Sequence, residues 1–184
     1  MALTAIQREA WRLLEGDSAI LDVARDVTRI LREIGIRGAV IGGVAVGLHG
    51  HVRATVDVDV LAPEPLEPLR DALTRNGYRF DRRKREFLRG HVPVQLVTEQ
   101  QTGGTAQRLT EIAGVQTVSL ADLISMKLRS GTRSVLRSQD IADVIGLIRA
   151  RRLTSAFAAK LARPLRAEFR KLVRAVRTAD GPAC

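Results

Sequence analysis

Two aspartates one residue apart, Asp57 and Asp59, are the side chains of this sequence best placed to do chemistry. They lie in a run of valine and threonine that is typical of a strand, although aspartate itself is depleted in strands. Because side chains alternate along a strand, a strand over residues 54–61 puts the valines on one face and both carboxylates on the other. Two like charges on one face repel each other, and a bound cation relieves that repulsion. The pattern therefore predicts a cation site at Asp57 and Asp59.

The side chains that face this site offer oxygen atoms, which hard metal ions prefer as ligands. Mg²⁺ is the expected ion, with Mn²⁺ as the alternative, and a phosphate group would complete its coordination shell. The expected site is one for a metal and a phosphate together.

A glycine-rich segment, residues 42–50, precedes the acidic run and follows a predicted strand. It lacks the Gly-Lys-Ser/Thr of a Walker phosphate loop, and the adjacent Gly42 and Gly43 fit the dinucleotide-binding pattern Gly-x-Gly-x-x-Gly poorly. Two interpretations remain. The glycines either let the backbone approach a phosphate ligand or let a strand and a helix pack closely.

Hydrophobic periodicity places these motifs on a framework of helices and strands. Apolar residues at helical spacing predict a helix over residues 18–33, capped by Ser18. The same reasoning predicts strands over residues 38–42, 54–61, 78–81, 86–89 and 92–98. It predicts helices over residues 44–48, 66–75, 119–131 and 138–149. Residues 153–177, which contain Pro164, are expected to form one or two further helices. This order predicts an α/β (α+β) fold, with a mixed sheet flanked by helices and a helical C-terminal region.

The composition is that of a globular protein. With 184 residues and 45% hydrophobic content, the chain is long enough for one good core, and residues 1–118 are expected to form the core domain and residues 119–184 the helical region. No apolar run approaches the roughly 18 residues of a membrane helix, and the N-terminus lacks the apolar centre of a signal peptide. The one cysteine, Cys184, has no partner within the chain, which suits a reducing compartment. A cytoplasmic protein without a membrane partner is expected.

Positive charge is concentrated toward the C-terminus. Residues 1–148 contain 20 Lys/Arg against 18 Asp/Glu, whereas the basic tail, residues 149–184, contains 10 against 2. Such a field attracts phosphate polymers such as RNA, and the alternative is a solvated helix face that aids solubility. The turn Arg-Arg-Lys-Arg at residues 82–85 is a smaller basic cluster, either a solvated turn or an RNA contact.

The glycine pair and the acidic run together resemble the signature of the DNA polymerase β-like nucleotidyltransferase superfamily. They supply Gly-Gly at residues 42–43, a short predicted helix, and Arg-x-Thr-x-Asp-x-Asp over residues 53–59. This form is most similar to small bacterial nucleotidyltransferases, including AbiEii-type toxins of type IV toxin–antitoxin systems. The resemblance implies a nucleotidyltransferase-like fold, a nucleoside triphosphate donor and a magnesium ion held by the two aspartates. The nucleotide-binding residues that it implies are Gly42, Gly43, Arg53, Thr55 and Lys127. For Arg53, a surface salt bridge is the alternative.

A second stretch, residues 119–144, resembles the helical segment of AbiEii-type proteins. By this resemblance Lys127 and Asp140 would be catalytic together with the two aspartates of the acidic run. Lys127 would hold the triphosphate, and Asp140 would support the metal or orient the lysine, with Asp143 as the alternative to Asp140. The competing interpretation is a surface helical hairpin with ordinary polar positions, in which Asp140 complements the helix dipole.

One position departs from the superfamily pattern. Many members place a third carboxylate on the strand predicted over residues 92–98, where this chain has Gln95. An amide binds a dication weakly and cannot accept a proton as a base. The chain is therefore either active with two metal carboxylates and Asp140 or a degenerate binder. AbiEii-type relatives also lack a simple strand-borne third acid, which favours activity.

These observations predict a metal-dependent nucleotidyltransferase that transfers a nucleoside monophosphate from a triphosphate to an RNA acceptor. By resemblance the acceptor would be a tRNA 3′ end, and the protein would be a toxin with a cognate antitoxin partner. An antibiotic nucleotidyltransferase is an alternative, which the basic tail disfavours because such small-molecule acceptors are cationic. A non-catalytic nucleotide- or RNA-binding protein is the other alternative.

Overall fold

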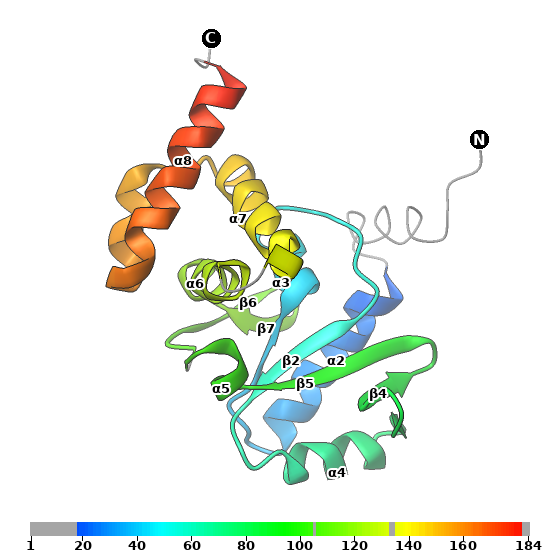
Figure 1. Cartoon of the computed structure of the whole chain (residues 1–184). Helices are drawn as coiled ribbons and strands as arrows, with labels where there is room; N and C mark the ends of the chain where they lie inside the picture. Colours follow the sequence, from blue (N-terminus) through cyan, green and yellow to red (C-terminus); the bar gives the residue numbers. More distant parts are fainter. Residues whose placement is uncertain (1–17, 105, 133–134, 182–184) are drawn as a thin grey trace, which may run out of the picture. The chain divides into compact units, whose positions relative to one another are not determined.

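The computed structural model describes residues 18–104, 106–132 and 135–181 (Figure 1). By its internal contacts the chain divides into two compact units, and each is described by itself. The first unit is Met1–Leu48 with Val52–Val118, and the second is His49–His51 with Ser119–Cys184. Cys184 lies outside the described residues. None of the helices in the described ranges combines the length and the apolar character needed to cross a bilayer.

The first unit is built on a seven-stranded mixed sheet with the order β3-β4-β5-β2-β1-β7-β6. Its strands are β1 (Ala39–Ile41), β2 (Val58–Ala62), β3 (Arg79–Asp81), β4 (Glu86–Arg89), β5 (Val92–Thr98), β6 (Leu109–Ile112) and β7 (Val115–Val118). β1 pairs antiparallel with β2 and parallel with β7, and β2 pairs parallel with β5. The α/β fold with a mixed sheet flanked by helices is confirmed.

Within the described ranges, four helices accompany this sheet, and their bounds are α2 (Ala19–Glu33), α3 (Gly42–Leu48), α4 (Glu67–Arg75) and α5 (Glu99–Thr102). α2 and α4 pack against one face of the sheet, where the hydrophobic core lies (Figure 1). α2 forms as predicted, because the Ser18 hydroxyl accepts a hydrogen bond from the Leu21 amide and Val27, Ile30 and Leu31 turn fully buried side chains to the core. α5 follows β5 directly, in a segment where the sequence analysis predicts neither a helix nor a strand.

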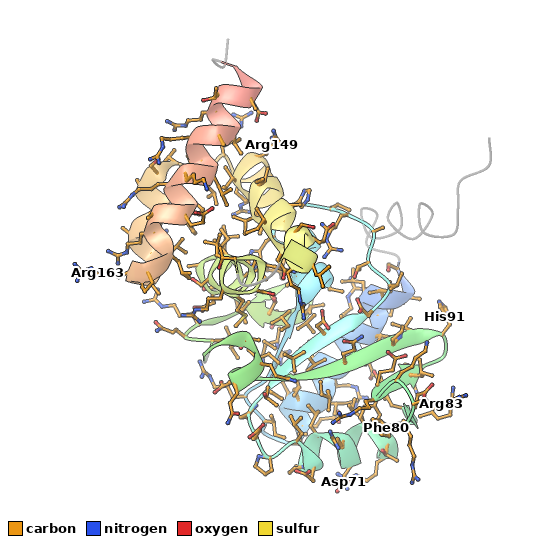
Figure 2. All side chains as sticks on the ribbon, in the orientation of Figure 1. Asp71, Phe80, Arg83, His91, Arg149 and Arg163 are labelled. Carbon is orange, nitrogen blue, oxygen red and sulfur yellow. The ribbon has the colours of Figure 1, made fainter. Side chains whose placement is uncertain are left out.

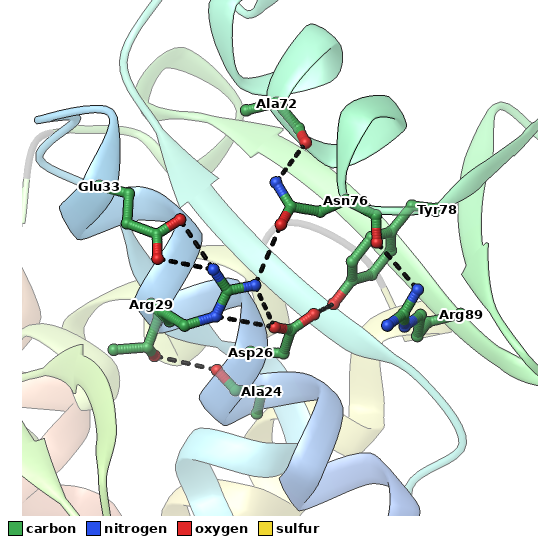
Figure 3. Close-up of polar contacts among 9 residues, drawn as sticks. Ala24, Asp26, Arg29, Glu33, Ala72, Asn76, Tyr78 and Arg89 are labelled. Atoms are coloured by element: carbon green, nitrogen blue, oxygen red, sulfur yellow. Dashed lines mark hydrogen bonds and ion pairs between the residues drawn. The ribbon is translucent and has the colours of Figure 1, made fainter.

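A polar network joins α2 to the turn after α4 (Figure 3). Asp26 accepts a hydrogen bond from the Tyr78 hydroxyl at 2.8 Å and from Nη2 of Arg29 at 2.6 Å. The same Arg29 guanidinium reaches Glu33 at 2.6 Å and the Asn76 side chain at 3.1 Å. Burial and the bond to Asp26 raise the pKa of Tyr78 above its ordinary value. The network fixes one end of the helical layer against the sheet.

The predicted strand over residues 54–61 is wrong at its beginning. β2 starts at Val58, so Asp57 lies just before the strand and Val56, with 58% of its surface exposed, does not join the buried face. On one side β1 ends at Ile41, whose register partner is Asp59, and on the other side β5 has Pro93, which has no amide hydrogen, at the register position before the Val58–Val94 pair. Residues before Val58 have no neighbouring backbone in β1 to pair with.

The hairpin of β6 and β7 is absent from the sequence-based prediction. Its two-residue turn, Ala113-Gly114, has φ angles of 53° and 80°, as type I′ turns require. Alanine is rare at positive φ, so the turn has no strong sequence signal. The predicted strands at residues 86–89 and 92–98 are confirmed with the same bounds.

The second unit is helical. Its elements are α6 (Leu120–Gly131), η1 (Val135–Arg137), α7 (Ser138–Ala150), η2 (Ser155–Lys160), η3 (Arg163–Leu165) and α8 (Arg166–Asp180). The expected helices over 119–131 and 138–149 are confirmed. Pro164 lies in the short 3-10 turn η3, and a single long helix, α8, follows it. α8 buries four apolar residues, namely Phe169, Leu172, Val173 and Val176.

Candidate active site

Gly42 and Asp59 are in direct contact at the point where β1 ends. The Asp59 carboxylate lies so close to the Gly42 Cα that a Cβ built there would overlap it, with the Asp59 Cγ only 2.8 Å away. Gly42 also has a φ of +66°, which favours glycine. The pairing of Ile41 with Asp59 brings the two residues together across the β1–β2 ladder.

Gly43 makes the matching contact with the segment before β2. A Cβ at this position would lie 2.8 Å from the Thr55 Cβ and 3.3 Å from Nη1 of Arg53. The buried Thr55 hydroxyl donates to Oδ1 of Asp57 at 3.3 Å, and Nη1 of Arg53 donates to the Ala54 carbonyl at 2.9 Å. The start of α3 and the Arg-x-Thr-x-Asp segment therefore form one packed unit.

Of the two interpretations of the glycine pair, close packing describes what these contacts show. The packing partner is the acidic run itself, so the glycines position the acidic groups. Asp57 and Asp59 remain half-buried rather than sealed off, which leaves their carboxylates accessible to solvent and solutes.

The donor set fits a hard metal ion that takes part of its shell from other molecules. Among the described residues, no group of three His, Cys, Asp or Glu side chains is arranged to hold a metal. Asp57 and Asp59 would supply two carboxylates, and water and phosphate oxygens would supply the rest. Mg²⁺ is commonly held in this way, through one or two carboxylates and the substrate's phosphates.

The neighbouring strand adds no third acid at this position. Gln95 is the register partner of Asp59 in the parallel β2–β5 pair, so the two side chains project from the same face of the sheet. Gln95 is exposed. An amide here offers a hydrogen bond to a ligand but no proton acceptor.

Lys127 and two aspartates form a buried ion cluster in the second unit. Nζ of Lys127 lies 2.7 Å from Oδ1 of Asp140 and 2.8 Å from Oδ2 of Asp143. The three side chains are 12%, 10% and 0% exposed, and Gln139 donates to Oδ1 of Asp143 at 3.1 Å. A surface hairpin with ordinary polar positions does not describe this arrangement.

Lys127 contacts both Asp140 and Asp143. They lie three residues apart in α7 and therefore on one face of the helix, and α6 presents Lys127 to that face. Gln139 is an additional member that the sequence reasoning missed, although its spacing of four residues from Asp143 was visible in the sequence.

The sequence-predicted residues thus fall into two groups. The first unit brings together Gly42, Gly43, Arg53, Thr55, Asp57 and Asp59, and the second unit brings together Lys127, Asp140 and Asp143.

A search of solved structures finds a nucleotidyltransferase-like fold. An antigenic nucleotidyltransferase-like protein from Paracoccidioides brasiliensis is similar over 69% of this chain and 74% of its own, with a TM-score of 0.53 and 19% identity. A weaker match is a tRNA-processing enzyme in its apo form, with a TM-score of 0.40 and 16% identity, which covers 85% of this chain and 47% of that chain. Another is a Thermotoga maritima CCA-adding enzyme complexed with tRNA, with a TM-score of 0.38 and 15% identity, which covers 88% of this chain and 54% of that chain. No family model matches the sequence, and no curated protein does.

Proposed function

We propose that this protein is a metal-dependent nucleotidyltransferase. The observation that carries the proposal is the packing of Gly42 against the Asp59 carboxylate, which joins the glycine pair to the acidic run in one site. Proximity in sequence alone would not require this contact. The nucleotidyltransferase-like fold agrees with it.

In the proposed reaction, a nucleophilic oxygen of the acceptor attacks the α-phosphate of a nucleoside triphosphate. A new phosphate ester bond forms, the bond to the β-phosphate breaks, and pyrophosphate leaves. Because the carboxylates are half-buried and braced by the glycine pair and Thr55, they are positioned before the substrate arrives. Fixed charges and correct positioning do most of the work in phosphoryl transfer.

Asp57 and Asp59 would hold Mg²⁺, with Mn²⁺ as the alternative. The ion, when bound, neutralises negative charge on the phosphates and on the leaving oxygen. Arg53, packed beside Gly43, supplies a cation of the chain's own for the phosphates. By the family resemblance, we propose that Lys127 holds the triphosphate and that Asp140, or alternatively Asp143, orients the lysine.

For the acceptor we propose RNA, by resemblance a tRNA 3′ end. The helical unit supports this, since α8 exposes Arg170, Lys171, Arg174 and Arg177 along its surface. A toxin activity with a cognate antitoxin, in the cytoplasm, would follow if the modified tRNA could no longer be aminoacylated.

The alternative of a non-catalytic binder rests on Gln95, which stands beside Asp59 on β5. It predicts that the protein binds nucleotide in the presence of Mg²⁺ without turnover.

A label-transfer experiment distinguishes the nucleotidyltransferase from the non-catalytic binder. The purified protein is incubated with Mg²⁺, each α-labelled nucleoside triphosphate in turn and total bacterial RNA. We expect label in tRNA-sized RNA, with loss of transfer in Asp57→Asn and Asp59→Asn. Asp71→Asn is the matched control, because Asp71 is an exposed acid of α4 outside the site (Figure 2). Nucleotide binding without release of pyrophosphate from the triphosphate, whichever acceptor is present, would refute the enzyme and support the binder.

A further inference from the structure

The first unit contains a cavity that the proposed catalytic site does not use. It has a volume of about 640 Å³ and lies between α4, the β3–β4 hairpin and the end of β5. The size is within the range of about 300–1,000 Å³ that small-molecule sites have. Its walls combine two aromatic rings, two arginines, one carboxylate and neutral amides, and the residues used below are Glu64, Arg70, Phe80, Arg85 and Gln100.

This cavity is on the other face of the sheet from the acidic site. Leu96, which lines it, is the register partner of the buried Val60 in the β2–β5 pair. Asp59 and Gln95 are the preceding pair, so alternation sends their side chains to the opposite face. A ligand of the cavity would therefore not occupy the site of the acidic run.

Phe80 gives the cavity an aromatic platform. The Phe80 residue has 38% of its surface exposed (Figure 2). Val56 and Leu136 are the other exposed large hydrophobic residues in the part of the chain that the structure describes. The ring is supported by Phe87 at a centroid distance of 4.9 Å and by the Arg70 guanidinium at 5.9 Å. A ring held in place yet open to solvent is suited to stack on a planar group.

Positive charge gathers at the same wall. Arg70 and Arg85 line the cavity, and Arg85 ends the basic turn over residues 82–85. Asp81 organises this turn by accepting hydrogen bonds from the backbone amides of Arg83 and Lys84, which leaves its carboxylate engaged with the backbone. In the described part of the chain the guanidinium groups of Arg82, Arg83 and Arg85 form no ion pair, so they are available to an anion.

We propose that this cavity binds an unpaired nucleotide, with its base stacked on Phe80 and its phosphate held by Arg70 and Arg85. Glu64 and Gln100, which also line the cavity, offer an acceptor and an amide to the polar edge of the base. Aromatic stacking beside a cationic groove is how proteins bind single-stranded RNA without strict sequence preference. The expected ligand is a nucleotide within a single RNA strand. A free nucleotide offers the same base and phosphate to the cavity. Binding here does not depend on catalysis at the acidic run.

The test uses the full-length chain and a single tryptophan as reporter. Trp11 is the only natural tryptophan, so the variant Trp11→Phe/Phe80→Trp places the one indole at the platform. A short single-stranded RNA is expected to quench its fluorescence, whereas the same RNA annealed into a duplex is not. If mononucleotides quench it at the same concentration as the strand, the cavity is supported with a free nucleotide as its ligand.

Affinities measured with labelled single-stranded RNA separate stacking from charge. Phe80→Leu keeps apolar bulk and loses the ring, and we expect binding to weaken by about fivefold to a hundredfold. Arg85→Gln is expected to weaken binding and to reduce its salt dependence. Arg79→Gln is the matched control, because Arg79 is exposed on β3 beside Phe80 and its side chain points to the other face.

Thermal unfolding of each variant checks that the fold is kept. The proposal is overturned if Phe80→Leu binds RNA as tightly as the unmodified chain, or if Arg85→Gln and Arg79→Gln weaken binding equally. It is also overturned if duplex and single strand quench the Phe80→Trp reporter alike.

Discussion

Nζ of Lys127 lies 2.8 Å from Oδ2 of Asp143, and the Asp143 side chain is completely buried. The same ammonium also contacts Asp140 at 2.7 Å. The ammonium thus lies between two buried carboxylates. Removing one member of such a cluster leaves buried charge without compensation, which costs more than the intact cluster gains.

Lys127→Met is therefore expected to destabilise the protein by about 3–5 kcal/mol, measured by chemical denaturation. The triple variant Lys127→Met/Asp140→Asn/Asp143→Asn removes the two carboxylate charges together with the ammonium and should recover part of that loss. Equal stability of Lys127→Met and the unmodified chain would show that the lysine is not needed to neutralise the two acids.

Gly42→Ala tests the contact between the glycine pair and the acidic run. A methyl group at Gly42 would overlap the Asp59 carboxylate and would stand at a φ of +66°. We expect nucleotide transfer to fall at least tenfold, with a loss of stability of about 1–3 kcal/mol. Label transfer and denaturation are the two measurements.

Gly90→Ala is the matched control for this change. Gly90 has a φ of +59°, but a Cβ there meets nothing within 4 Å. It therefore carries the backbone strain without the collision with Asp59. If both variants lose transfer equally, the effect comes from strain and not from the position of the carboxylate.

Much of the fold could be predicted because its signals are local. The Ser18 cap and the 3.6-residue spacing of apolar residues define α2, and the turn residues on either side define β4 and β5. The beginning of β2 could not be read in this way. Val56 has the residue type of a strand, but β1 is too short to pair with it, and on the β5 side the position before the Val58–Val94 pair is Pro93, which has no amide hydrogen to donate.

The candidate site residues likewise differ in how far the sequence could predict their contacts. The glycine pair and the acidic run were expected to act together because their order and spacing resemble the signature of a nucleotidyltransferase superfamily. The pairing of Lys127 with both Asp140 and Asp143 depends on how α6 and α7 pack, which no local pattern specifies. The platform at Phe80 was missed for a related reason, since exposure of an aromatic ring is a property of the folded surface.

Tyr78→Phe tests the network that joins α2 to the β3 segment. The hydroxyl donates to Asp26 at 2.8 Å, and a hydrogen bond to a charged group contributes about 1.5–3 kcal/mol. The expected loss of stability is of that order at neutral pH. Denaturation of the variant beside the unmodified chain measures it.

The same hydroxyl gives stability a pH dependence. Desolvation and the bond to Asp26 raise the pKa of Tyr78 in the folded state above the ordinary 10.0. The folded chain therefore keeps the proton when the unfolded chain releases it, so this contribution is complete below pH 10 and decreases as the pH rises above it. Tyr78→Phe should lack this decrease, and an identical alkaline profile for both chains would contradict the assignment.

Gly146→Ala tests the packing of the second unit. A Cβ at Gly146 would collide with the ring of His51, because α7 and residues 49–51 meet there without a side chain between them. The position is fully helical, so alanine would by propensity favour the helix by about 1 kcal/mol. We nevertheless expect Gly146→Ala to lower the melting temperature, since overpacking costs about 1–3 kcal/mol.

In a His51→Ala background the ring is gone, and the same substitution should then raise the melting temperature. This reversal of sign separates a collision with His51 from a general intolerance of alanine, and a decrease in both backgrounds would rule the collision out.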